Sequence, residues 1–156
     1  MNTDSYRIGD EPSPGALSAI AVNPFWPFVA IMFGGAWLSW SWFLLNSAAV
    51  GSPTRTREYA WILAGIIGSA ILTFFVLVLA AQDAIKEEHI KYALLIVTTW
   101  KLGVTYALYS LQNHTIDLYE YYGGKLANGI YFVIAGALAS PFVLSALPPY
   151  FRLILN

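Results

Sequence analysis

The chain has 156 residues, of which 58% are hydrophobic and only 11% are charged, and its formal net charge is −1. A soluble domain carries about 25% charged residues, and the single core of so short a chain saturates before it hides this much apolar surface. The composition therefore predicts an integral membrane protein and, without a basic net charge or any cysteine, excludes nucleic-acid binding, disulfide bonds and thiolate catalysis.

The first 22 residues form the most polar part of the chain. They are acidic and contain Pro12 and Pro14, and they lack the basic segment and apolar core of a cleaved signal peptide. We therefore expect residues 1–22 to form a flexible or surface-lying tail. The first crossing helix then serves as an uncleaved insertion signal.

Four apolar runs follow, each long enough to cross roughly 30 Å of hydrocarbon, which takes about 20 helical residues. They cover about 27–50, 59–81, 92–111 and 126–147. Short links force neighbouring helices to run antiparallel. The predicted fold class is all-α, an integral membrane protein with four transmembrane helices in an up-down antiparallel bundle within residues 23–149. Residues 150–156 are expected to form a short interfacial tail.

Four spans place both termini and the second link on one side of the membrane. That side carries four basic residues and the other carries three, namely Arg7, Lys86, Lys91 and Arg152 against Arg55, Arg57 and Lys125. The positive-inside rule then favours cytoplasmic termini.

The segments Leu44-Leu45-Asn46 and Tyr59-Ala60-Trp61 flank a short Gly-bearing link and resemble parts of small multi-pass bacterial proteins. That resemblance implies no particular activity. The expected location is a bacterial inner (cytoplasmic) membrane.

Lys101 is the ionisable residue inside a predicted span, ten positions beyond Lys91 and therefore about 15 Å along the helix, near the midplane. At about 100° per residue it belongs to a polar stripe on one helix face: Thr98, Lys101, Thr105, Tyr109 and Gln112. The stripe should face protein or water, and an ionisable group at this depth is by default functional. Several alternatives remain. Lys101 could snorkel to an interface, the threonines could bond to their own helix, or the helix bounds could differ by a turn and place Lys101 nearer one surface. Lys101 could also be neutral, or be held by a carbonyl group, Asn46, another subunit or a ligand.

Small residues recur at four-residue spacing on the second predicted helix, at Ala60, Ala64 and Gly68. Small residues let membrane helices approach closely, and helices associate in lipid largely through such contacts. This face is predicted to pack either within the bundle or against another subunit.

The link predicted over 112–125 is the longest, and it is polar and aromatic. It is the expected recognition surface outside the membrane, with His114, Asp117 and Glu120 at three-residue spacing. These three would make a poor metal site without a fourth ligand and a scaffold, and solvated link residues are the simpler interpretation.

No catalytic residue, cofactor or metal site is predicted, because the two histidines, His89 and His114, lie outside the spans. The first functional hypothesis is a subunit, anchor or immunity-type interaction partner within a membrane complex. The second is an oligomeric channel or carrier for a small anionic solute, with Lys101 facing the path. The third is a membrane enzyme on a lipid substrate. The expected partners are membrane lipid and either a homo-oligomer or a hetero-complex with other membrane subunits, and no nucleic acid.

Overall fold

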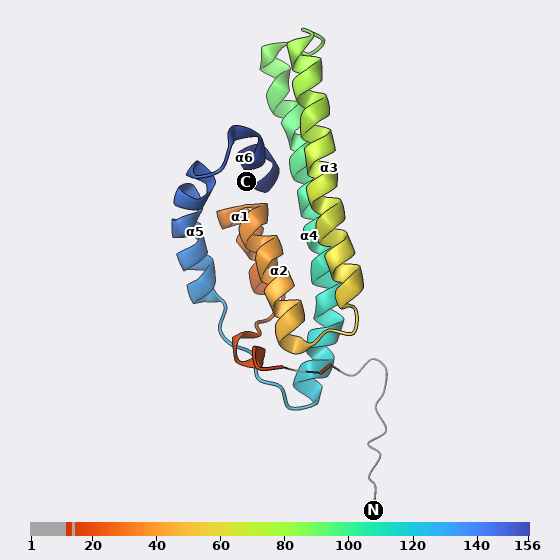
Figure 1. The fold of residues 1–156 in the computed structure, drawn as a ribbon, viewed down its shortest axis with the longest axis vertical. Helices are drawn as coiled ribbons and strands as arrows, with labels where there is room; N and C mark the ends of the chain where they lie inside the picture. The colour runs from red at the N-terminus through yellow and green to blue at the C-terminus, as the bar shows by residue number, and fades with distance from the viewer. Residues whose placement is uncertain (1–11, 14) are drawn as a thin grey trace, which may run out of the picture.

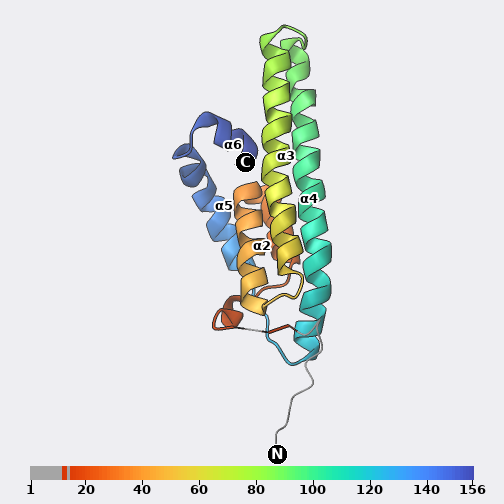
Figure 2. The same ribbon diagram turned by 45° about the vertical axis from the view of Figure 1, so that its right-hand side comes forward.

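The computed structural model describes residues 12, 13 and 15–156. Over that range the chain is all-α and without strands, apart from an isolated bridge between Val22 and Ala127. The elements are η1 (Ser18–Ile20), a 3-10 turn, and the helices α1 (Phe25–Gly34), α2 (Ala36–Val50), α3 (Arg55–Ala81), α4 (Glu87–Tyr121), α5 (Ile130–Ser145) and α6 (Pro149–Leu155). Figures 1 and 2 show α3 and α4 as one long hairpin, with α1 and α2 beside its lower half and α5 outside them.

The first apolar run forms two helices that lie side by side. The backbone N–H of Val22, just before α1, donates to Oδ1 of Asn46, near the end of α2, at 2.9 Å. The chain therefore turns back between α1 and α2 (Figure 1). At the turn, Gly35 has a φ of +84°, a left-handed conformation that glycine adopts at little cost. The single helix predicted over 27–50 is wrong, because hydropathy gives the length of an apolar run but not its direction.

α4 is longer than the predicted span of 92–111, because the helix continues into polar sequence at both ends. It comprises 35 residues, about 52 Å at 1.5 Å per residue. Residues 112–121 contain no glycine or proline, and the first breaker is Gly123, with a φ of +87°. The link predicted over 112–125 is therefore wrong for residues 112–121, which form the last turns of α4.

α5 and α6 form the C-terminal part of the fold. α5 is shorter than the predicted 126–147, and Oδ1 of Asn128 accepts the Ile130 N–H at its start, at 3.1 Å. α6 begins at Pro149, a position where proline fits because the first N–H groups of a helix have no partner within it. α6 folds back to contact α2, α3 and α5 (Figure 2). Residues 150–156 thus differ from the predicted interfacial tail.

The predicted tail over 1–22 is described only in part. Residues 1–11 and 14 lie outside the described residues, so the flexibility expected for them stays a prediction. Ala21 and Val22 are fully buried, and Ala21 packs with Ala49 of α2. The end of the tail is therefore a packed part of the fold.

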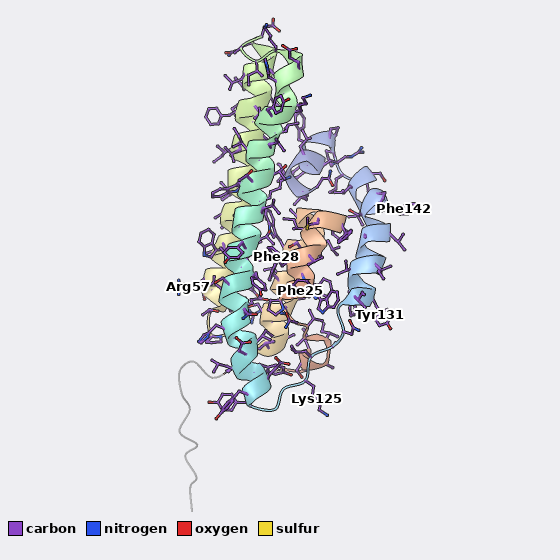
Figure 3. The ribbon with its side chains drawn as sticks, turned by 180° about the vertical axis from the view of Figure 1, so that it is seen from behind. Phe25, Phe28, Arg57, Lys125, Tyr131 and Phe142 are labelled. Atoms are coloured by element: carbon purple, nitrogen blue, oxygen red, sulfur yellow. The ribbon has the colours of Figure 1, made fainter. Side chains whose placement is uncertain are left out.

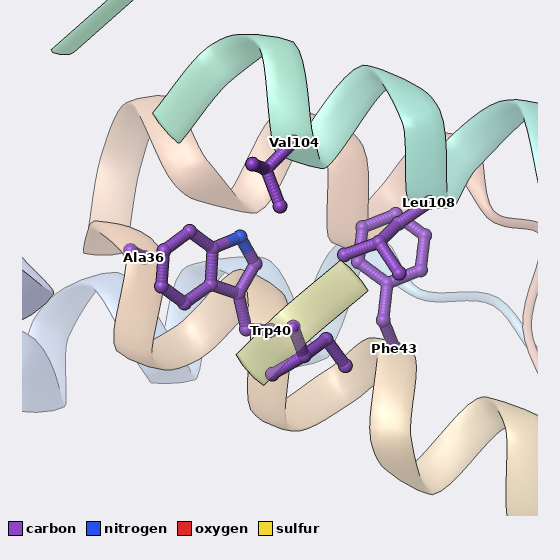
Figure 4. Packing of buried hydrophobic residues seen from close by; sticks show 6 residues of the cluster. Ala36, Trp40, Phe43, Val104 and Leu108 are labelled. Atoms are coloured by element: carbon purple, nitrogen blue, oxygen red, sulfur yellow. The ribbon is translucent and has the colours of Figure 1, made fainter. Parts of the chain in front are cut away.

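The largest part of the core lies where α2 packs on α3 and α4. Six buried residues form it: Ala36, Trp40, Phe43, Ile62, Val104 and Leu108. Figure 4 shows Trp40 and Phe43 of α2 directed toward Val104 and Leu108 of α4. This contact holds the α1–α2 hairpin against the α3–α4 hairpin.

Much of the outer surface is apolar. Large hydrophobic side chains are exposed along the helices, including Phe74 and Phe75 on α3, Ile96 on α4 and Phe142 on α5. Within the described chain, α3 and α4 are the two helices long and apolar enough to cross a membrane, and only 28% of the most apolar 18-residue window of each is buried. A core helix of a soluble protein is buried all round when it is this apolar. Exposed apolar surface of this extent is typical of membrane or protein contact.

Candidate functional site

A buried carboxylate lies at the base of the α3–α4 hairpin. Glu58, in the first turn of α3, is 0% exposed and accepts hydrogen bonds from three neutral donors. Ser52 Oγ and Thr54 Oγ1 donate to Oε1 at 2.5 and 2.7 Å, and Gln112 Nε2 donates to Oε2 at 2.6 Å. Among the described residues no basic side chain pairs with Glu58. The neutral donors and the positive end of α3 therefore stabilise the carboxylate.

Two buried amides extend this contact to α2. Asn46 Nδ2 donates to Gln112 Oε1 at 3.0 Å, and Gln112 Nε2 also donates to the Phe43 carbonyl oxygen at 2.7 Å. Asn46 accepts the Val22 N–H in turn. We call these five side chains the Glu58 network: Asn46, Ser52, Thr54, Glu58 and Gln112. The network joins the start of α1, the end of α2, the start of α3 and the lower part of α4.

Sequence reasoning missed Glu58 because the helix was expected to begin at Tyr59, which left Glu58 in a link. α3 begins four residues earlier, at Arg55. A threonine at the N-cap position and a glutamate in the first turn are both typical of a helix N-terminus, and Thr54 and Glu58 have these positions in α3. That pattern is the signal that could have found Glu58.

Lys101 lies on the inner face of α4 and is 6% exposed. Its Nζ donates to the backbone oxygens of Leu153 at 2.7 Å and Asn156 at 2.8 Å. These oxygens lie at the C-terminal end of α6, where carbonyl groups lack partners within the helix and carry partial negative charge. A pocket of about 190 Å³ lies beside the ammonium, and Thr98 contributes to its lining.

The other members of the predicted polar stripe divide between interior and surface. Thr105 is fully buried, accepts from Trp40 Nε1 at 3.0 Å and donates to the carbonyl oxygen one turn earlier at 2.8 Å. Gln112 belongs to the Glu58 network, and Tyr109 is partly buried against the core. Thr98 is exposed and donates to the carbonyl oxygen one turn earlier in its own helix. Of the alternatives given for the polar stripe, Thr98 therefore fits the one in which a threonine bonds to its own helix.

Several helix ends meet beside Lys101. A Cβ on Gly35 would lie 2.7 Å from the carbonyl carbon of Asn156, whose oxygen accepts from Lys101. Ser140 Oγ, on α5, donates to the Gly34 carbonyl oxygen at 2.8 Å. We call this meeting point the central junction, formed by Gly34, Gly35, Lys101, Ser140 and Asn156. It brings together the turn between α1 and α2, the end of α6 and the upper part of α5.

The three residues of the predicted packing face, Ala60, Ala64 and Gly68, do not share one environment. A Cβ on Gly68 would lie 2.5 Å from the Trp100 ring, so Gly68 lets α3 and α4 pack closely within the chain. Ala60 is exposed and Ala64 is partly buried, and both line a shallow pocket of about 310 Å³. Gly68 thus packs α3 against α4 within the hairpin, while Ala60 and Ala64 face outward.

His114, Asp117 and Glu120 are exposed on the last turns of α4 rather than in a loop. Asp117 Oδ2 accepts from Asn113 Nδ2 at 3.2 Å. Within the part of the chain that the structure describes, no three His, Asp or Glu side chains are grouped to hold a metal ion. Recognition by these residues stays a prediction, now for a helix end.

Comparisons of the chain with protein-family models, with curated proteins and with solved structures find no match.

Proposed function

We propose that this chain is an interaction subunit of a membrane complex, with a partner protein packed against the central junction. In this arrangement α3 and α4 cross the bilayer, while α1, α2, α5 and α6 enter from one side and stop near its middle. The observation that carries the proposal is the convergence of helix ends beside Lys101, part-way along the α3–α4 hairpin.

The depth of the central junction follows from the polar residues at the ends of the hairpin. α3 is apolar from Tyr59 to Ala81, about 34 Å at 1.5 Å per residue, which is close to the roughly 30 Å of bilayer hydrocarbon. Lys91 marks the charged end of the hairpin, and Lys101 lies about 15 Å further along α4. The central junction therefore belongs near the midplane of the bilayer.

At this depth Gly34, Gly35, Lys101 and Ser140 are already buried within the chain, and the exposed polar groups beside them, Asn156 and Arg152, need protein or water around them. Lipid cannot satisfy backbone groups, so irregular backbone occurs inside a membrane only where protein covers it or a water-filled cavity reaches it. Arg152 shows the same need, because its side chain is exposed on α6 while it donates to the carbonyl oxygens of Ser145 at 2.7 Å and Leu147 at 2.9 Å. A partner that covers the central junction would also cover this guanidinium and the upper apolar faces of α3 and α4.

Helix length favours two crossing helices over the four predicted from the sequence. α1 has 10 residues and α5 has 16, about 15 and 24 Å at 1.5 Å per residue. Both lengths are below the hydrocarbon thickness of about 30 Å. Four crossing helices, a bacterial inner membrane and cytoplasmic termini all stay predictions.

Cross-linking at two matched positions on α5 tests the proposed partner. Phe142 lies two residues beyond Ser140, on the outer side of α5, and Tyr131 lies in the first turn; their exposed fractions are 77% and 73% (Figure 3). Each is replaced by a photoreactive phenylalanine analogue, and the chain is isolated in lipid-retaining polymer discs. We expect a defined cross-linked complex from position 142 and none from position 131. A chain that is monomeric at every concentration, or that cross-links equally at both positions, contradicts the proposal.

A second candidate function is a carrier or channel for a small anionic solute, favoured by the pocket of about 190 Å³ beside Lys101. An ammonium has three N–H donors and two are used here, which leaves one for a solute. Anion flux into liposomes should then be lost in Lys101→Met and kept in Lys91→Met, which removes an exposed lysine of the same helix. Absence of flux in the unmodified chain rejects this function.

A further inference from the structure

An apolar groove runs between α3 and α4 on the outside of the hairpin. Its volume is about 680 Å³, within the range of small-molecule sites, and it is lined mainly by Trp61, Leu72, Leu95, Ile96, Trp100 and Gly103. The polar groups in its wall are already bonded within the chain, since Thr99 Oγ1 donates to the Leu95 carbonyl oxygen at 2.8 Å and Trp100 Nε1 to that of Gly65 at 3.3 Å. The groove therefore offers an occupant mainly apolar contact and no free hydrogen-bond donor.

The floor of the groove is open at one glycine. A Cβ on Gly103 would meet no atom within 4 Å, whereas one on Gly68 would meet Trp100 at 2.5 Å. Gly103 thus has no role in packing α3 against α4, and it leaves room for an occupant. From Trp61 to Leu72 the groove extends about 16 Å along α3, close to the roughly 15 Å of hydrocarbon in one leaflet.

A basic residue stands at one end of this groove. Trp61 also lines the neighbouring pocket of about 310 Å³, which Arg57, Ala60 and Ala64 complete. Arg57 is exposed, and within the described chain no side chain forms an ion pair with it. Figure 3 shows it on the side of the hairpin that faces away from α5. The adjacent Glu58 is buried in its own network and leaves the charge of Arg57 uncompensated.

We propose that the groove and Arg57 together bind one anionic phospholipid. The acyl chain lies in the groove from Trp61 toward Leu72, and the phosphate accepts hydrogen bonds from the Arg57 guanidinium at the membrane surface. Arginine presents a planar fork of donors that matches a phosphate, and basic residues at this depth attract anionic lipids. A helix from a second copy would fill the groove but would leave Arg57 without an anion, so the charge at its mouth favours a lipid. This inference is independent of the proposed partner at the central junction.

Lipid titration of the purified whole chain, followed by native mass spectrometry, tests the site. The probes are phosphatidylglycerol and phosphatidylcholine with identical acyl chains. We expect the unmodified chain to bind phosphatidylglycerol about fivefold more tightly, the effect of one basic residue at a membrane surface. Arg57→Gln should remove that preference. Arg55→Gln should keep it, because Arg55 lies two residues away and donates to the Tyr59 hydroxyl at 2.6 Å.

The groove is tested by Gly103→Phe, which fills it, with Leu138→Phe on the exposed face of α5 as the matched control. We expect Gly103→Phe to weaken binding of both lipids and Leu138→Phe to leave it unchanged. Equal affinity for the two lipids, equal effects of Arg57→Gln and Arg55→Gln, or full binding by a folded Gly103→Phe chain each overturns the proposal. If Gly103→Phe breaks a dimer and leaves lipid binding intact, the occupant is a second copy. If that variant does not fold by circular dichroism, the two arginine variants alone decide.

Discussion

Glu58 and Lys101 are buried ionisable side chains, and among the described residues neither pairs with an oppositely charged side chain. Each is instead stabilised by the end of a helix. Lys101 meets the carbonyl groups at the end of α6, and Glu58 is in the first turn of α3. A helix end carries a partial charge fixed by the backbone, so it stabilises a buried ion without a second mobile side chain. Both residues therefore determine which helix ends meet inside the fold.

Replacement of Glu58 by alanine should destabilise the chain by about 2–3 kcal/mol, because Gln112 would keep a buried N–H without an acceptor, and Ser52 and Thr54 would be left with only each other as partners. The thermal unfolding midpoint of the purified chain in detergent should fall by several degrees. Glu58→Gln is the matched control, since it keeps the shape and one acceptor oxygen and should lose less stability. If Glu58→Ala unfolds at the same temperature as the unmodified chain, the network has no stabilising role.

Helical rotation of about 100° per residue is enough to place Lys101, Thr105 and Gln112 on one face, and the structure buries all three. Helical periodicity does not predict the hydrogen-bond partners of these side chains. Leu153 lies 52 residues from Lys101 in the sequence, and it becomes a partner only because α6 folds back. Periodicity thus predicts which side chains face inward, while the groups that receive them depend on long-range packing.

At the scale of the helix, the sequence predicts apolar lengths better than it predicts turns. The run over 27–50 is continuous in hydropathy, and the break at Gly35 is marked only by two adjacent glycines. α4 shows the opposite case, because polar residues after 111 end the apolar run without ending the helix. Helix ends follow from backbone conformation and capping, and hydropathy reports on neither.

Gly35→Ala should cost at least about 1–3 kcal/mol, because a side chain is strained at a φ of +84°. The new Cβ would also lie 2.7 Å from the Asn156 carbonyl carbon and would push α6 from the central junction. We expect faster amide hydrogen exchange in α6 and a lower unfolding midpoint. Gly103→Ala is the control, since its Cβ meets open space within a helix and should stabilise the chain by up to about 1 kcal/mol. Exchange in α6 that is unchanged by Gly35→Ala would show that the turn does not hold α6.

For the whole molecule, the turn at Gly35 changes which segments share a side of the membrane. In a four-span bundle, the segment before the first helix lies on the same side as the turn between α3 and α4. In the arrangement proposed above, α1 and α2 enter and leave on one side, so the described residues just before α1 lie with the α2–α3 and α4–α5 links. Among the described links, the turn between α3 and α4 then lies alone on the opposite side. Composition predicts the membrane, but this assignment depends on one turn.

Single cysteines distinguish the two topologies, because the chain contains no cysteine of its own. Ala19→Cys, Pro53→Cys, Asp83→Cys and Lys125→Cys all place a thiol at an exposed position. In sealed vesicles of one orientation, a membrane-impermeant maleimide should label Ala19→Cys together with Pro53→Cys and Lys125→Cys, and should give the opposite result at Asp83→Cys. Permeabilised vesicles should label all four variants, which controls for reactivity. Labelling of Ala19→Cys together with Asp83→Cys would restore the four-span bundle. It would also remove the midplane helix ends from which we infer a partner.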